Sequence, residues 1–170
     1  MTTTGNPYAV TTNVLPYLID QLAALVSSAD PIAKIHTYMS RAVDPDIFMD
    51  AFLIEREDGK KEVRCWEIFL EHIRVERSGS GSPPVPLGFM HMHHSFKING
   101  WLSYVEGQSD VRFRSMVDAV LKRLGSRIRI ESTTRTLPPE ADFRGIVNKS
   151  RTLAHAVAIT YTLVEVVGIT

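Results

Sequence analysis

Histidines crowd one short stretch of the chain, HMHH, inside the longer run GFMHMHHSFKINGWLSY. His91 and His93 are two residues apart, so an extended strand turns both side chains to one face, where imidazole nitrogens can bind a transition metal. A catalytic zinc site needs three protein ligands and a structural one needs four, and no cysteine pair or HExxH motif accompanies the histidines. Glu67, Glu71 or His72 on a partner strand could supply a further ligand. We interpret the pair as part of a polar solvent or interface face, with a metal-dependent enzyme using His91 and His93 as the alternative.

Other catalytic chemistry has little support in the sequence. No G-x-S-x-G elbow surrounds a serine, and the glycines of SGSGS do not follow a strand as a phosphate cradle does. The single cysteine, Cys65, falls on an apolar position of a strand, which predicts a buried structural thiol and no disulfide. We therefore predict a non-enzymatic protein with no catalytic residue, no cofactor and no bound metal.

Two long extended runs position these side chains. They are KEVRCWEIFLEHIRVER and the histidine-bearing run, joined by the connector SGSGSPPVPL. In the second run, alternation places Met92 and Phe96 on an apolar face and His91 and His93 on the other. The first run is apolar on both parities in its middle, which predicts cover on both faces. The pattern predicts a hairpin over 61–105, about 50 Å long at ~3.3 Å per residue, whose tip projects beyond the core.

A projecting tip usually meets another chain, so we predict an oligomer or partner interface there. Glycines make the connector at 78–87 pliable, and its prolines favour an extended course that does not close a tight turn. The predicted interface residues come from both strands and the connector: Arg74, Glu76, Arg77, Ser78, Gly79, Pro83, Pro84, Val85, Pro86, Leu87, His91 and His93.

Two amphipathic helices are predicted outside the hairpin, each with an apolar stripe at helical spacing. The first begins at Asn13 as N-cap and ends at Ser28, with Pro16 in its first turn, where proline is tolerated. The second begins with Ser109 as N-cap and ends at Gly125 in the left-handed conformation.

Shorter elements fill the rest of the chain. The predicted strands are 32–39, 127–131 and 153–167. The Asp-Pro pair at 44–45 predicts a short helix after it, with a loop containing one turn as the alternative. Gly59 predicts a positive-φ turn, and Gly100 suggests a bulge or bend. Residues 132–151 lack periodicity and predict a long loop with a turn at 142–145.

These elements predict an α+β fold: a mostly antiparallel or mixed sheet of four to five strands, with two amphipathic helices on one face and a long projecting β-hairpin. The chain should form one domain over 13–170 after a flexible tail at 1–12. Basic and acidic residues balance at 19 each, so no global field favours nucleic acid or an anionic membrane. The sequence has no apolar run of the ~18 residues that a membrane helix needs and no signal segment, which predicts a soluble, cytosolic protein.

The order of elements resembles the tail-terminator and related neck, or head-tail joining, proteins of long-tailed bacteriophages. The likeness covers most of 13–167 and rests on W-E-I in the first long strand, F-x-I-x-G-[WY] in the second and the following helix SDVRFRSMVDAV. The Thr-rich N-terminus and the 132–151 segment depart from the family pattern. They leave open whether the chain is the terminator or another neck component.

This resemblance implies a structural virion protein, assembled in the cytoplasm of a bacterial host. It would form a homo-oligomeric ring, expected to be a hexamer, that caps the tail tube, stops its polymerisation and offers a docking face to the head connector. Its partners would be its own copies, the tail tube protein and the head completion protein. DNA would pass through the channel without specific binding, and no membrane would be involved. Another connector or minor tail protein, and a stand-alone ligand-binding domain, remain alternatives.

Overall fold

The computed structural model describes residues 9–37, 51–77, 79, 87–105, 107–125, 134–149 and 152–168. Its elements are α1 (Ala9–Ala29), β1 (Lys34–His36), β2 (Leu53–Glu55), β3 (Lys61–Arg77), β4 (Phe89–Ser103), α3 (Ser109–Leu124), β5 (Thr134–Thr136), β6 (Glu140–Lys149) and β7 (Thr152–Gly168). Ala51 and Phe52 are also helical, in the region where a short helix is predicted.

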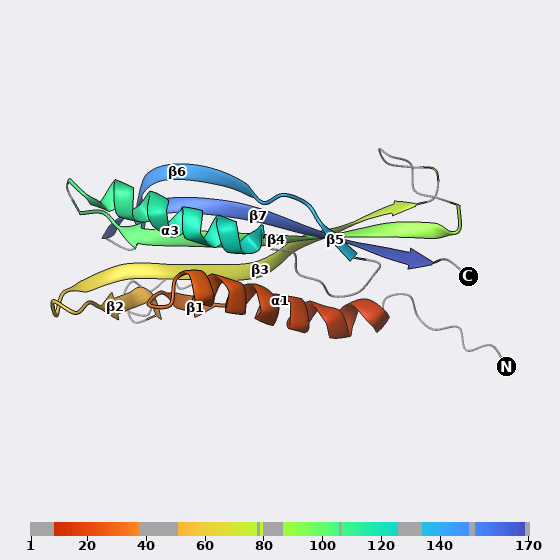
Figure 1. Ribbon diagram of the computed structural model, residues 1–170, viewed down its shortest axis with the longest axis horizontal. Coiled ribbons are helices and arrows are strands. Elements are labelled where there is room, and N and C mark those ends of the chain that lie inside the picture. The colour runs from red at the N-terminus through yellow and green to blue at the C-terminus, as the bar shows by residue number, and fades with distance from the viewer. Residues whose placement is uncertain are drawn as a thin grey trace.

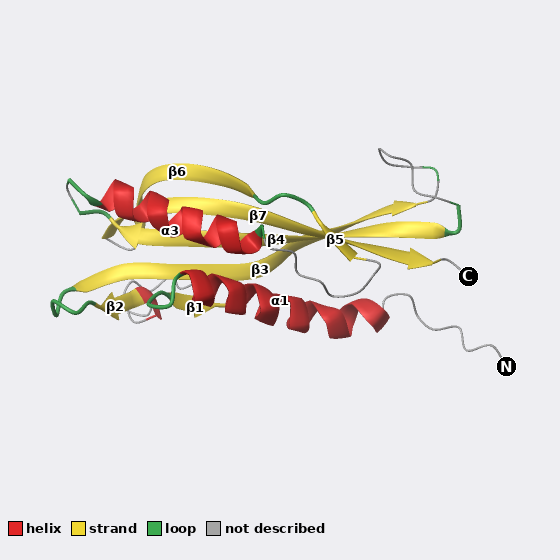
Figure 2. Ribbon diagram, viewed as in Figure 1, coloured by secondary structure: helices red, strands yellow, loops and turns green. Residues whose placement is uncertain are grey.

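The described strands form one mixed sheet, with α1 and α3 side by side on one of its faces (Figures 1 and 2). The strand order is β1-β3-β4-β7-β5, with β2 also paired to β3 and β6 also paired to β7. Only the β1–β3 pair is parallel among these pairings. The predicted combination of a mixed sheet with two helices on one face is confirmed.

The centre of the sheet is formed by its three longest strands. β3 and β4 pair antiparallel from Arg64–Leu102 to Arg77–Met90, and β4 pairs with β7 along its whole length. The two extended runs of the sequence are therefore adjacent strands, as predicted. Figure 1 shows all three strands continuing well past the end of α3. We call this continuation, from β3 Glu71 to the ends of β4 and β7, the outer half of the sheet.

The main core lies between the helices and the inner half of the sheet. Its buried members come from α1, α3 and the three long strands: Leu18, Leu22, Val26, Trp66, Ile68, Phe96, Ile98, Leu102, Phe113, Met116, Val117, Val120, Leu124, Val157, Ile159, Tyr161 and Leu163. Gly100 lies directly against Trp66, since a Cβ on Gly100 would clash with the indole ring, so the glycine makes room for the tryptophan. The pairing with β3 and β7 runs through Gly100 without a shift, so the suggested bulge there is wrong.

The opposite face of the sheet is covered at the same end. Phe52, Val63, Cys65, Trp101 and Ala156 form a second buried cluster there. The prediction that β3 is apolar on both faces because both are covered is confirmed for its inner half. Cys65 is fully buried and in no disulfide, as expected of a structural thiol.

Buried charges join both helices to β3. Asp30, directly after α1, accepts hydrogen bonds from Arg64 Nε and Trp66 Nε1, each at 2.9 Å, and Arg64 Nη2 lies 2.7 Å from its Oδ1. Glu62, also buried, accepts two hydrogen bonds from Arg112 of α3 at 3.0 and 3.1 Å. Both of these buried carboxylates are thus paired with a guanidinium, which offsets the cost of burying a charge.

The strand count of four to five is wrong, because the described sheet has seven strands. β2 and β5 have three residues each, too few to show a period. The loop predicted over 132–151 is also wrong, since this segment contains β5 and β6. From 140 to 146 every residue of β6 is exposed, so no alternation of buried and exposed side chains marks it. The turn expected at 142–145 is a bulge, where the pairing with β7 shifts between Phe143 and Gly145.

The ends of both helices differ from the predictions. α1 begins at Ala9, so Pro16 lies inside the helix and the tail predicted at 1–12 loses its last four residues to α1. The sequence predicted a later start, at Asn13, because the threonines before it are poor helix formers. In α3 the N-cap is Gln108, because the Ser109 hydroxyl donates to the Val105 carbonyl instead of capping. Gly125 is right-handed, with φ −69°, and closes the helix by donating its N–H to Leu121.

The strand predicted at 32–39 is β1, and the one at 153–167 is β7. Gly59 has φ +75° as predicted for the turn before β3. The strand predicted at 127–131 lies outside the described residues, as does most of the short helix after 44–45.

Candidate functional site

A bulge in β3 decides which side chains face which way in the outer half of the sheet. The register with β4 shifts between Leu70 and His72, leaving Glu71 as the extra residue. Ile73 therefore pairs with His94 and Val75 with Met92, on the face that carries the helices. Counting by twos from Val63 places Ile73 and Val75 on the opposite face, which is wrong because the bulge changes the parity.

On the face away from the helices, four side chains from two strands meet, and we call them the polar cluster: Arg74, Glu76, His91 and His93. Glu76 pairs directly with His91 across the ladder and Arg74 pairs with His93. Arg74 Nη2 donates to Glu76 Oε1 at 2.6 Å, and His93 Nε2 lies 3.2 Å from Glu76 Oε2. The two imidazole rings are 6.5 Å apart between centroids.

The polar cluster is half-buried at its centre and exposed at its rim. The Glu76 and His93 side chains are 14% and 16% exposed, whereas the Arg74 side chain is 67% exposed. His93 Nε2 is buried and has no hydrogen bond, because its 3.2 Å approach to Glu76 Oε2 does not have hydrogen-bond geometry. The cluster thus holds a carboxylate and an unsatisfied imidazole nitrogen side by side.

The helix-side face of the outer half carries both exposed apolar groups and a part-buried polar pair. Ile73 is 38% exposed and Val75 45% exposed. His94 is buried, and its Nε2 lies 3.0 Å from Glu165 Oε2 of β7. This face is therefore only partly covered beyond the main core.

Two long stretches of strand edge are unpaired among the described residues, and we call them the open edges. On the side of β3 away from β4, β2 pairs with Lys61–Val63 and β1 with Cys65–Glu67, but no described strand pairs with 68–76. At the other side of the sheet, β6 pairs with β7 alone. The two open edges belong to different strands on opposite sides of one sheet (Figure 1).

The structure brings together four of the predicted interface residues, those of the polar cluster. Arg77 ends β3 beside them, paired with Met90. Of the connector, the structure describes Gly79, with φ +81°, and Leu87, which is 87% exposed. Ser78, Pro83, Pro84, Val85 and Pro86 lie outside the described residues.

Sequence reasoning did not identify Glu76 as the carboxylate beside His91 and His93. Glu67, one of the candidates offered, is buried at the inner end of β3, where it pairs with Asn99. If the two runs are folded back symmetrically about the connector, each residue of β3 beyond the bulge pairs with a residue two positions from its observed partner. The two positions lie on the same face of the second strand. That symmetry is the signal in the sequence that could have led to Glu76.

A serine and a histidine also meet in the core. Ser109 Oγ lies 2.9 Å from His155 Nε2 and donates to the Val105 carbonyl at 2.6 Å. Both residues are buried, and His155 stacks on Phe113 at 5.3 Å between ring centroids. A substrate has no access to this pair, so we assign it to stability.

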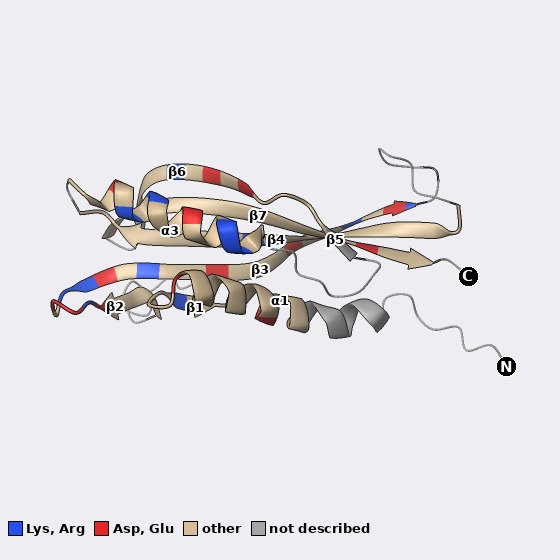
Figure 3. Cartoon of the chain, viewed as in Figure 1, with Lys and Arg blue, Asp and Glu red and all other residues tan. Residues whose placement is uncertain are grey.

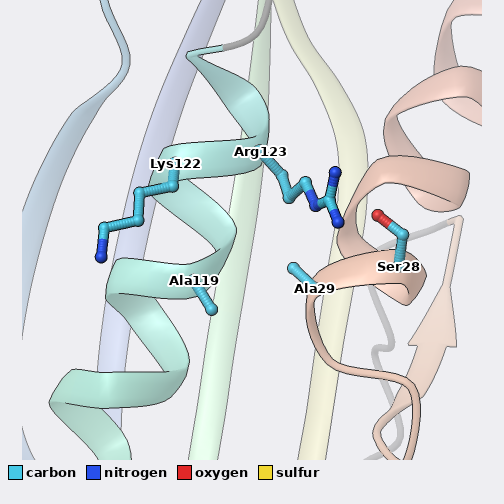
Figure 4. Close-up of a pocket in the computed structure, with 5 residues that line it drawn as sticks. All are labelled: Ser28, Ala29, Ala119, Lys122 and Arg123. Atoms are coloured by element: carbon cyan, nitrogen blue, oxygen red, sulfur yellow. The ribbon is translucent and has the colours of Figure 1, made fainter.

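Two grooves lie on the helix layer. One lies between the ends of α1 and α3, lined by Ser28, Ala29, Ala119, Lys122 and Arg123. Figure 4 shows Arg123 reaching toward Ser28 while Lys122 points to the other side. The second runs over α3 alone and is lined by Val111, Arg114, Ser115, Asp118, Ala119 and Lys122. Neither lining contains a histidine, a cysteine or paired carboxylates.

No protein-family model matches the chain, and no curated protein matches it as a relative. Within the described part of the chain, no helix is both long and apolar enough to cross a membrane.

Proposed function

We propose that this protein is a structural subunit that joins copies of itself through its open edges into a ring, and that this ring is the tail terminator of a long-tailed bacteriophage. The observation that carries the proposal is the pair of open edges on opposite sides of one sheet. Unpaired strand edges pair readily with another chain unless they are blocked.

The two open edges differ, which determines the kind of assembly. The β3 edge of one copy would meet the β6 edge of the next, and such a head-to-tail contact closes into a ring or continues as a filament. The edges also sit at different ends of the sheet, because β6 pairs with β7 from Thr152 to Thr160 whereas the β3 edge lies in the outer half. A ring, expected to be a hexamer from the family resemblance, is the closed form of this contact.

The outer half of the sheet supplies a second surface, for partners of the ring. It extends past α3 and ends in the connector, so in a ring it would project from one rim. On this proposal the outer half meets the tail tube protein or the head completion protein, and the ring ends tube growth by covering the last tube subunits. Another neck or minor tail protein would use the same surfaces and is the runner-up.

Light scattering on the purified, untagged chain tests the ring, with electron microscopy to show its shape. We expect a closed oligomer for the wild type. Ile73→Lys in β3 and Ile146→Lys in β6 each place a charge on an exposed position of an open edge and should give folded monomers. Val111→Lys, on an exposed position of α3, is the matched control and should still assemble.

Two results would contradict the proposal: a wild-type chain that stays monomeric at its solubility limit, alone and with tube protein, or edge variants that assemble as the wild type does. The terminator role has its own readout. Added to polymerising tail tube subunits, the ring should shorten the tubes and appear at one end, whereas another neck protein would leave tube length unchanged.

A further inference from the structure

We propose that Glu76, His91 and His93 form a binding site for a divalent transition metal of the Zn²⁺ class. This site departs from the prediction of no bound metal made from the sequence alone, because Glu76 joins the two histidines only in the folded sheet. It does not depend on the ring proposal, and we assign it no catalytic role. One ligand atom from each residue lies within 4.8 Å of the others, so a small side-chain movement brings all three within reach of a single ion.

The donor set fits zinc chemistry. Two imidazole nitrogens and one carboxylate oxygen are ligands that Zn²⁺ accepts, and three protein ligands leave a fourth position for water or an added group. Ligand atoms about 2.0–2.2 Å from one tetrahedral ion lie about 3.3–3.6 Å from each other. His93 Nε2 and Glu76 Oε2, at 3.2 Å, are already close to this separation. Only the His91 ring must move closer, a side-chain rotation within the half-buried cluster.

The strands support this geometry rigidly. His91 and His93 share one face of β4, which is hydrogen-bonded on both sides by β3 and β7. On β7 their cross-strand neighbours are Val166 and Val164, and Val164 is fully buried. An apolar flank excludes water from one side of the ligands and strengthens their attraction for a cation.

An unsatisfied nitrogen points to a ligand at this place. His93 Nε2 is buried and has no hydrogen-bond partner in the described structure, although Glu76 lies beside it. Buried polar atoms usually have a partner, and a bound ion is one of the recognised explanations for an exception. A metal bound between the two groups would satisfy both.

Arg74 would compete with the metal for the Glu76 carboxylate. Its guanidinium bonds Glu76 Oε1, whereas the other carboxylate oxygen, Oε2, faces His93. Because the Arg74 side chain is 67% exposed, it can swing into solvent without leaving a buried charge behind. Removing it should therefore raise the affinity for the metal.

The test is a calorimetric titration of ZnCl₂ into the untagged, metal-stripped full-length protein, with Co²⁺ as the spectroscopic probe of coordination. We expect one ion per chain and a higher melting temperature with zinc. His93→Ala and Glu76→Gln should each weaken binding by at least about tenfold, while Arg74→Ala should tighten it. His72→Ala is the matched control, because His72 is an exposed histidine on β3, the strand of Glu76, and lies outside the cluster. This variant should bind zinc as the wild type does.

Circular dichroism and the melting temperature without metal establish that each variant is folded, so a loss of binding reports the site itself. The proposal is overturned if the wild type binds no zinc. It is equally overturned if zinc binds but His93→Ala and Glu76→Gln bind it unchanged, because the ion then sits adventitiously elsewhere.

Discussion

Asp30 links the first helix to the centre of the sheet through side chains alone. Its two carboxylate oxygens serve two different partners, Arg64 through Oδ1 and Trp66 through Oδ2. Trp66 in turn fills the space that Gly100 leaves open on β4. One carboxylate thereby fixes a guanidinium and an indole, and with them the register in which α1 lies on β3.

We predict that Asp30→Ala lowers the free energy of unfolding by about 3 to 5 kcal/mol, because it leaves Arg64 and the Trp66 N–H without their buried acceptor. Urea denaturation followed by tryptophan fluorescence measures the loss. Asp20→Ala, at an exposed position of the same helix, is the control and should change stability by less than about 0.5 kcal/mol. Equal losses for the two variants would contradict the assignment.

Tyr161 contributes a dependence of stability on alkaline pH. Burial raises the pKa of Tyr161 to about 12, an effect that the neighbouring Thr136 side chain partly offsets. Its hydroxyl has no well-formed hydrogen bond in the described structure. Between pH 10 and 12 the tyrosine ionises in the unfolded chain but stays protonated in the folded one. Its contribution to stability is therefore complete below pH 10 and is lost as pH rises from 10 to 12.

Tyr161→Phe should consequently be as stable as the wild type at pH 8, or more stable, since it removes an unsatisfied buried hydroxyl. Above pH 10 it should lose less stability than the wild type, by about 1.4 kcal/mol per pH unit. Denaturant melts at pH 8, 10 and 11 give the comparison. A variant that is clearly less stable at pH 8 would show that the hydroxyl has a favourable partner after all.

At the scale of elements, α3 is the main cover of the inner sheet. Phe113, on the buried stripe of this helix, stacks on His155 and meets Phe143 of β6 edge-on at 6.1 Å. The helix thus contacts two neighbouring strands through one ring. Val111, in the same turn, is 71% exposed and contributes nothing to the core cluster.

We predict that Phe113→Ala costs about 3 to 5 kcal/mol of stability, the usual effect of removing a buried aromatic ring. Val111→Ala, in the same helical turn, should cost less than about 0.5 kcal/mol. Thermal melts of the two variants beside the wild type are the measurement. An unchanged melting temperature for Phe113→Ala would mean that the helix does not rest on the sheet.

Elements with at least one covered face could be predicted from the sequence, and those without one could not. Both helices show a period because one side of each meets the core, and the long strands are rich in apolar residues because their inner halves are covered. β6 is exposed along most of its length, so its residues carry no alternation to detect. The bulge at Glu71 has no side-chain signature, yet it reverses the faces of Ile73 and Val75.

The candidate site, too, could be predicted from the sequence only in part. The spacing of His91 and His93 placed them on one face, because alternation holds along an unbroken strand. Glu76 belongs to another strand, and its place beside them depends on the register of the hairpin. Tertiary pairing, which local patterns do not encode, therefore supplied the third group.

At the scale of the whole molecule, the charge pattern bears on the proposed ring. Acidic and basic residues are interspersed along β3 and α3 (Figure 3) and balance over the chain. In the outer half, Glu71 lies 3.5 Å from Lys97, and Arg74 bonds Glu76. Mixed charges of this kind favour register and specificity between subunits more than affinity.

A channel for DNA must let a polyanion slide without trapping it, and a strongly basic lining would bind DNA through counterion release. With zero net charge, the chain should show no measurable affinity for duplex DNA at physiological salt. The assembly itself should weaken as salt rises from ~0.1 to ~1 M, over which the Debye length falls from about 10 to 3 Å. Fluorescence anisotropy with labelled duplex DNA tests the first expectation, and light scattering across the salt series tests the second. Sub-micromolar DNA binding with a steep salt dependence would contradict this expectation. The function would then be DNA binding by the basic residues of the last third of the chain, among them Arg135 and Arg144.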